Sequence, residues 1–155
     1  MAGSSVGKFL RLSASERGLL TRTVIILAVA RLATWILPFN TARRLVVTRP
    51  RREGAASFTN EQIHWAITNA QRLVPQATCL PQALTAESLL HRAGRDAILR
   101  IGVKKPASGK FIAHAWVVSE GRIVVGALPP HEMAEFTPLP PLPGIWPDPG
   151  SKRTM

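Results

Sequence analysis

The chain contains one cysteine, Cys79, and a lone cysteine is either a core residue or a nucleophile. A thiol attacks only as its thiolate, and an ordinary cysteine with a pKa of ~8.5 is mostly protonated at neutral pH. A catalytic cysteine therefore needs a neighbouring cation or a helix N-terminus. We expect a helix to begin at Cys79, because Pro81 is acceptable in a first turn. The backbone N–H groups of that turn are natural donors to an oxyanion formed on an attacked carbonyl.

The partner of such a cysteine is a histidine on a separate element, which takes the thiol proton and later protonates the leaving amine. His114 is the best of the four histidines, because it lies in a predicted strand 35 residues after Cys79 (114 minus 79). His64 and His91 fall in predicted helices, and His131 falls in a proline-flanked loop. We predict that Cys79 and His114 are the catalytic pair, and that the other three histidines have ordinary surface or core roles.

Three neighbouring residues are candidates for substrate binding or for the oxyanion site: Gln76, Leu80 and Trp116. The side-chain amides of Gln76 and Gln82 can donate hydrogen bonds, and Leu80 lies in the first turn of the expected helix. Trp116 follows His114 by two residues and therefore shares its strand face. The indole could cover the imidazole or line the substrate groove, and packing in the core is the alternative.

The composition does not predict a metal or a cofactor. One cysteine and four widely spread histidines do not form the cluster that a structural zinc site needs, and no glycine-rich phosphate loop is visible. A single cysteine cannot form an internal disulfide, and the N-terminus lacks the pattern of a secretory signal. Together these features favour a reducing, cytoplasmic setting.

The elements that would position the pair begin with an apolar helix. Ser13 and Glu16 form a capping box, and the helix should run over about 14–37. Arg22 and Arg31 leave only eight uninterrupted residues between them, far short of the ~20 that a membrane span requires. We therefore expect an amphipathic or buried helix, with peripheral contact to an anionic membrane surface as the alternative.

Two further helices should follow. Thr59 and Gln62 make a second capping box, and apolar residues recur at helical spacing until Pro75. The third helix should run from Cys79 to a C-terminal glycine cap at Gly94. Cys79 is then placed at a helix N-terminus.

Beyond this helix the pattern changes to the period of two that is typical of strands. Segments 97–103, 111–118 and 123–125 read as strands, and Glu120 and Gly121 make a turn, so the last two strands form an antiparallel hairpin. The predicted fold class is α+β, with N-terminal helices followed by a small antiparallel sheet.

Several blocks of the sequence resemble the leader peptidases of lasso peptide biosynthesis, which are bacterial transglutaminase-like cysteine proteases. The blocks are Cys-Leu-Pro-Gln-Ala-Leu-Thr-Ala-Glu-Ser-Leu-Leu at 79–90, Arg-Ala-Gly at 92–94, Leu-Arg-Ile-Gly-Val at 99–103, Phe-Ile-Ala-His-Ala-Trp-Val at 111–117 and Leu-Pro-Phe at 37–39. The resemblance implies a papain-like or transglutaminase-like core in which Cys79 is the nucleophile and His114 the general base. It also implies partners: a ribosomally made precursor with its leader, a small leader-binding protein and a cyclase that uses ATP to close a macrolactam ring.

The chain departs from that family at the third catalytic position. The family is described with a Cys-His-Asp triad whose acid follows the histidine on the next strand. If residues 120–121 are the turn, paired residue numbers sum to 241, so His114 lies opposite Ala127 and beside Gly126. Neither Gly126 nor Ala127 carries a carboxylate.

Three explanations of the missing acid are open. A backbone carbonyl orients the imidazole, a carboxylate such as Glu132 or Asp96 arrives from elsewhere, or the enzyme works as a dyad. We favour the carbonyl or the dyad, because a cysteine hydrolase depends less on the third group when its thiolate is already stabilised.

Length and charge set the organisation of the whole chain. The 155 residues, 46% of them apolar, can close one core, and the formal charge of +11 favours acidic partners such as an acidic leader peptide. We expect a hydrophobic helix and basic linker over 1–53, the protease core over 54–136, and a proline-rich tail without regular structure over 137–155. The arginines of 43–53 should form a solvated surface, and nucleic-acid binding is not expected there because no aromatic residues interleave with them.

Two other functions remain as alternatives. A transglutaminase or acyltransferase would use the same scaffold but would let an amine replace water in the second step. A non-catalytic basic binding protein would keep Cys79 only as a core residue.

Overall fold

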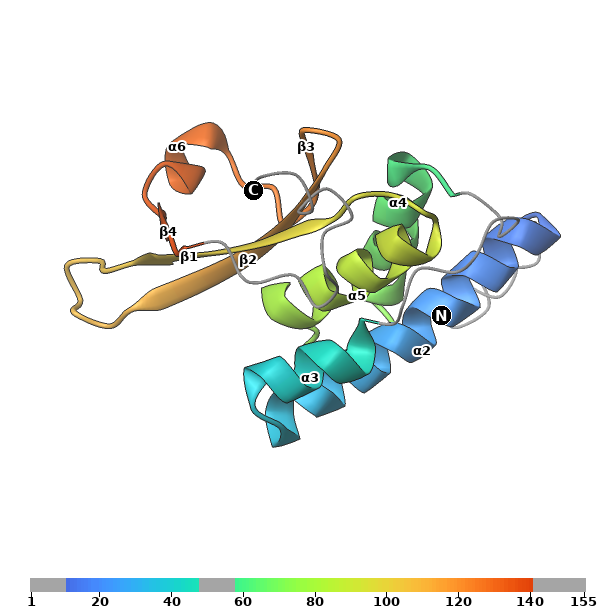
Figure 1. The fold of residues 1–155 in the computed structure, drawn as a ribbon, viewed down its shortest axis with the longest axis horizontal. Coiled ribbons are helices and arrows are strands. Elements are labelled where there is room, and N and C mark those ends of the chain that lie inside the picture. The colour runs from blue at the N-terminus through green and yellow to red at the C-terminus, as the bar shows by residue number, and fades with distance from the viewer. Residues whose placement is uncertain (1–10, 48–57, 141–155) are drawn as a thin grey trace, which may run out of the picture.

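The computed structural model describes residues 11–47 and 58–140, and these residues form an α+β fold (Figure 1). In this part of the chain four helices precede the first strand, and a fifth, one-turn helix lies between the third and fourth strands. The helices are α2 (Ala14–Ile36), α3 (Phe39–Val46), α4 (Asn60–Ala70), α5 (Cys79–Arg92) and α6 (Pro130–Met133). The strands are β1 (Ile98–Lys104), β2 (Ile112–Ser119), β3 (Arg122–Val125) and β4 (Thr137–Pro138), and they pair antiparallel in the order β3-β2-β1-β4.

Both predicted capping boxes are confirmed. The Ser13 side chain accepts a hydrogen bond from the Glu16 N–H at 3.2 Å, and the Glu16 carboxylate accepts one from the Ser13 N–H at 2.8 Å. Thr59 and Gln62 make the same reciprocal pair at the start of α4. Each box satisfies two backbone donors that the first turn of a helix leaves free, so α2 and α4 begin where the sequence predicts.

The central helix α5 begins at Cys79 as predicted, and it ends before Gly94, whose φ is +71°. Its residues from Ala83 to Leu90 are all buried, because α2, α3 and α4 pack against it together with β1, β2 and β3. In Figure 1, α2, α3 and α5 lie below the strands and α6 lies above them. The helical layer therefore covers one face of the sheet and fixes the end of α5 that carries the cysteine.

The hairpin between β2 and β3 has the predicted turn but not the predicted register throughout. Glu120 and Gly121 both have positive φ, 50° and 76°, as the tight hairpin turn requires. The pairs next to the turn sum to 241 as expected, but the register shifts at Val117, which pairs with Val125 instead of Val124. A bulge inserts one extra residue into one strand, and turn chemistry alone does not reveal it. β3 ends at Val125, so His114 has no partner on that strand.

Side chains of the two long strands separate onto two faces. Leu99, Ala115 and Val117 belong to the same buried cluster as the helices, so this face of the sheet is the inner one. Successive strand residues point to opposite faces, which places His114 and Trp116 on the outer face. On this outer face, Phe136, which follows α6, packs against His114.

The predicted basic linker is wrong in its first part. Residues 43–46 belong to α3 instead. The Arg43 side chain is only 9% exposed, and its Nε donates to Glu87 Oε2 at 3.1 Å. A buried arginine needs such a carboxylate partner, and the pair joins α3 to α5. The rest of that linker, from residue 48 to residue 53, lies outside the described residues.

The proline-rich end is also more regular than predicted. His131 lies in α6 and not in a loop, because Pro130 is tolerated in the first turn of a helix. Thr137 and Pro138 pair with β1, where Pro138 occupies the edge strand, the place in a sheet where a residue without an N–H is tolerated. The remainder of the tail, 141–155, lies outside the described residues, and the three-part division of the chain stays a prediction.

Candidate active site

Cys79 is half-buried and is the first residue of α5, where the helix leaves backbone donors unused. Thr78 precedes it at the capping position but makes no side-chain cap hydrogen bond, unlike Ser13 and Thr59 on the other long helices. The first bond closing the helix runs from the Gln82 N–H to the Thr78 carbonyl at 3.3 Å. The N–H groups of Cys79 and Leu80 therefore have no acceptor within the helix, and they lie beside the thiol.

The loop before Cys79 is fixed by two side-chain hydrogen bonds. Gln76 adopts a left-handed conformation with a φ of 57°, and its Oε1 accepts from Arg31 Nη2 at 2.8 Å. Gln82 Nε2 donates to the Ala77 carbonyl at 2.6 Å. Of the two predicted amide donors, Gln82 thus uses its amide nitrogen within the loop, whereas Gln76 bonds through its oxygen and keeps its amide nitrogen available.

A groove of about 490 Å³ lies beside the cysteine. Thr78 and Leu80, the two chain neighbours of Cys79, both line it, so the predicted role of Leu80 near the substrate fits its position. The opposite wall comes from α2, with Arg31 and the 75% exposed ring of Trp35. Sequence reasoning missed this wall, because nothing in the pattern of the first helix indicates that its C-terminal turn lies against the loop before Cys79.

His114 is oriented by a backbone carbonyl. Its Nε2 lies 2.7 Å from the Gly126 carbonyl oxygen, and because a carbonyl can only accept, Nε2 carries the proton. Nδ1 then has the lone pair that a general base uses. The Trp116 ring stacks on the imidazole with centroids 6.0 Å apart, and the Phe136 ring lies 5.5 Å away. Trp116 is 7% exposed, so its ring is packed inside the protein as well as stacked on the imidazole, and both alternatives for this residue stay open.

Gly126 leaves no space for the acid that the family pattern places near it. Its φ is +85°, and a Cβ at this position would lie 2.5 Å from the Ala115 carbonyl oxygen and 2.8 Å from Trp116 Cβ. A side chain of any kind would therefore collide with β2. In the described part of the chain, neither Glu132 nor Asp96 makes a hydrogen bond to His114. Of the three explanations of the missing acid, the geometry agrees with the carbonyl.

The structure brings the elements of the predicted pair together but does not join their side chains. α5 packs directly against β2, which carries His114. His114 lies on the outer face of the sheet, however, and its neighbour Ala115 faces the helices. The hydrogen bond of the imidazole goes to Gly126 and not to Cys79, so the pairing of Cys79 with His114 stays a prediction.

The other histidines have structural contacts or lie exposed. His64 Nδ1 lies 2.7 Å from the Val124 carbonyl and links α4 to β3. His91 lies 4.0 Å from Glu87, and burial lowers the pKa of the imidazole below 6.5. The side chain of His131 is 77% exposed. Within residues 11–47 and 58–140, no three His, Cys, Asp or Glu side chains are grouped to bind a metal ion.

Comparison with known protein families matches residues 23–140 to the family described as "Transglutaminase-like superfamily". The matched range contains Cys79 with its groove, and His114 with the carbonyl of Gly126. Searches of curated proteins and of solved structures found no match.

Proposed function

The chain belongs to the transglutaminase-like superfamily, and from this membership we propose that it is a cysteine peptidase that removes the leader from a ribosomally made lasso peptide precursor. The superfamily provides the scaffold of a cysteine protease or acyltransferase. The finer assignment is supported by the sequence blocks around Cys79 and His114 that resemble the leader peptidases of lasso peptide biosynthesis.

The observation that carries the proposal is the uncapped start of α5. Thr78 leaves the first-turn donors without a side-chain acceptor, although the same type of residue caps α4. Unused N–H groups at a helix N-terminus can donate hydrogen bonds to a neighbouring thiolate or oxyanion, whereas a structural cysteine needs neither. The groove is lined by Thr78 and Leu80 and not by Cys79 itself, and a peptide bound in it would lie at that end of the helix.

The proposed reaction has two steps. His114 Nδ1 takes the thiol proton, and the Cys79 thiolate attacks the carbonyl carbon that joins leader to core. The oxyanion accepts hydrogen bonds from the N–H groups of Cys79 and Leu80. The C–N bond breaks, the imidazolium protonates the leaving amine of the core peptide, and a thioester to the leader remains. Water, deprotonated by Nδ1, then releases the leader as a carboxylic acid and regenerates the thiol.

This reaction requires Sγ and Nδ1 to come within hydrogen-bond distance when substrate is bound. Because His114 lies on the outer face of the sheet and bonds to Gly126, this approach requires the imidazole to leave its observed position. In its observed position the Gly126 carbonyl holds the proton of the neutral imidazole on Nε2, which leaves Nδ1 as the nitrogen that would take the thiol proton.

The proposed partners follow from the same resemblance. A leader-binding protein would present the precursor, and an ATP-dependent cyclase would close the macrolactam ring on the released core. The charge of +11 is compatible with an acidic leader or carrier, and we place the protein in the bacterial cytoplasm.

The test uses a candidate precursor incubated with and without a leader-binding partner, with the products read by mass. We expect leader and free core from the wild type, and no cleavage from folded Cys79→Ala or His114→Ala. His131→Ala is the matched control, since that histidine is exposed and should be dispensable. Cleavage by Cys79→Ala at the wild-type rate would falsify the assignment.

The same reagents separate the alternatives. Product mass shows whether an amine has replaced water, as an acyltransferase requires. Iodoacetamide reports on Cys79 alone, because the chain has one cysteine. We expect fast alkylation at neutral pH that slows in His114→Ala, whereas a slow rate that His114→Ala leaves unchanged indicates a non-catalytic binding protein.

A further inference from the structure

The outward face of α2 carries a row of exposed apolar side chains. Its four members are 41% to 69% exposed: Ile25, Val29, Leu32 and Ile36. Their spacing of four, three and four residues aligns them along one side of the helix, and we call them the outer stripe. An exposed apolar row of this length marks an interaction surface more often than chance exposure does.

The inner side of α2 is equally apolar, which restricts how the stripe can be covered. Leu19, Leu27 and Ala30 are buried against the rest of the protein. By length and composition α2 could cross a membrane, but a third of its apolar window is buried inside the protein. If α2 crossed a bilayer, its buried side chains would lose their contacts with the core. Any contact with lipid must therefore be made by a helix that lies parallel to the membrane surface.

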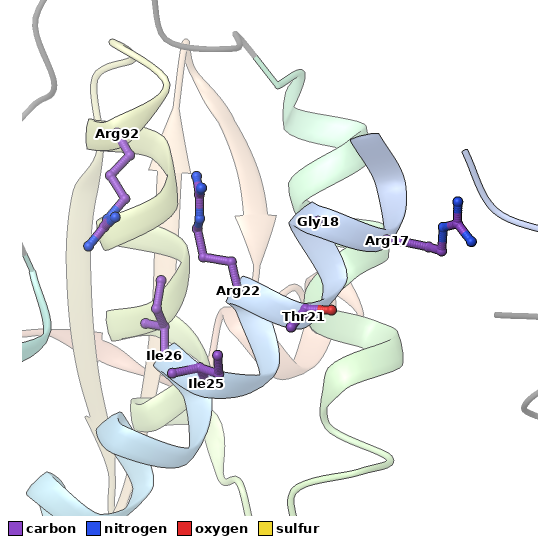
Figure 2. A pocket seen from close by; sticks show the side chains of 7 residues that line it. All are labelled: Arg17, Gly18, Thr21, Arg22, Ile25, Ile26 and Arg92. Atoms are coloured by element: carbon purple, nitrogen blue, oxygen red, sulfur yellow. The ribbon is translucent and has the colours of Figure 1, made fainter. Parts of the chain in front are cut away.

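Arginines border the stripe at its N-terminal end. Arg17, Arg22 and Arg92 line a shallow depression of about 500 Å³, together with Gly18, Thr21, Ile25 and Ile26. Figure 2 shows Arg22 of α2 and Arg92 of α5 extending into the space between the two helices, while Arg17 points to the other side. Among residues 11–47 and 58–140, no acidic side chain lines this depression. The positive charge of the arginines favours binding of an anion, and the neighbouring isoleucines provide an apolar surface directly beside it.

Charge decides between the partners that an apolar stripe could take. A second copy of this chain would bring another formal charge of +11 against the same arginines, so a symmetric dimer through this face is opposed by repulsion. An anionic lipid bilayer offers both requirements at once, with phosphate groups next to acyl chains.

We propose that α2 is a peripheral membrane-docking helix. The outer stripe enters the interface of an anionic bilayer, and Arg22, which lines the depression, binds a lipid phosphate group. The proposal is independent of the peptidase activity, because the stripe and the depression share no residue with the groove beside Cys79.

The experiment measures flotation of the purified full chain with vesicles of phosphatidylcholine alone and of phosphatidylcholine mixed with phosphatidylglycerol. We expect binding to the mixed vesicles only, weakened by salt. Leu32→Ser combined with Ile36→Ser should reduce binding by roughly tenfold or more, since two apolar side chains lose their burial. Arg22→Gln should reduce it by about fivefold, the factor that corresponds to ~1 kcal/mol per basic residue near an anionic surface.

Matched controls keep the result specific. Ile98 and Phe111 are 47% and 72% exposed and lie on the sheet side of the molecule, so Ile98→Ser with Phe111→Ser removes similar apolar surface and should bind as the wild type does. Circular dichroism checks that each variant is folded. Failure of the wild type to bind mixed vesicles overturns the proposal. So does binding that survives in the stripe variant, or a wild-type dimer that the stripe variant turns into a monomer.

Discussion

His114 depends for its orientation on a main-chain atom. The Gly126 carbonyl accepts from Nε2, and the backbone of β2, the strand that carries His114, passes so close to Gly126 that no Cβ fits there. A carboxylate at this position and the observed carbonyl contact are therefore mutually exclusive. A neutral carbonyl fixes the tautomer of the imidazole but stabilises an imidazolium less than a carboxylate does.

Substitution of Gly126 tests this at the residue scale. We expect Gly126→Ala to lower the free energy of unfolding by about 1–3 kcal/mol more than Gly109→Ala does, as measured in urea. Both glycines have positive φ, but a Cβ at Gly109 would meet nothing within 4 Å, so the control isolates the collision from the backbone strain. Gly126→Asp should likewise destabilise and should not raise cleavage. A gain of activity in that variant would show that the position can accept an acid.

Helices α3 and α5 are joined through a buried charge pair. Arg43 and Glu87 are hydrogen-bonded, and their side chains are 9% and 2% exposed. Such a pair contributes little net stability, but removing one partner leaves a charge without compensation in the core. The pair therefore specifies how α3 sits on α5 more than it strengthens the fold.

Arg43→Met should lower the free energy of unfolding by about 3–5 kcal/mol, because Glu87 stays buried without its partner. Adding Glu87→Leu to that variant should recover most of the loss. Arg44→Met, at the exposed neighbouring position, is the control and should change stability by less than about 0.5 kcal/mol. Equal losses in Arg43→Met and Arg44→Met would contradict a structural role for the pair.

The C-terminal end of α5 makes stability depend on pH. Burial lowers the pKa of His91 below its ordinary value of 6.5, and the Glu87 carboxylate partly opposes this shift. The unfolded chain then binds a proton more readily than the folded protein, so stability is complete above pH 6.5 and falls as pH drops toward the folded pKa. His91→Gln should reduce the loss seen in urea unfolding between about pH 7.5 and about pH 5.5. An unchanged loss would mean that other groups cause it.

Over the whole molecule, the sequence predicts local features well. Capping boxes announce the starts of α2 and α4, Cys79 begins α5 as expected, and the Glu120-Gly121 turn defines the hairpin. Each of these signals is contained within a few residues, which is why it can be read without the fold. The motif blocks gave the resemblance to transglutaminase-like proteases, and the superfamily match over residues 23–140 confirms its coarser part.

Features that depend on distant residues were missed. Arg43 looks like a linker residue until Glu87 is found opposite it, and Pro138 looks irregular until β1 offers it an edge. The wall of the groove formed by Trp35 and Arg31 depends on how α2 packs, and the bulge at Val117 depends on the whole sheet. All four features depend on contacts between residues far apart in the sequence, and the periodicity of a segment does not predict such contacts.

Gly126 also constrains what mutation can do to this protein. Every residue type has a carbonyl oxygen, so no codon change can delete the atom that orients His114. A substitution at this position can only add a side chain where glycine has none. The position of the orienting carbonyl thus depends on the absence of a Cβ at residue 126. A variant at Gly126 would disturb the contact with His114 by displacing the backbone and not by removing a functional group.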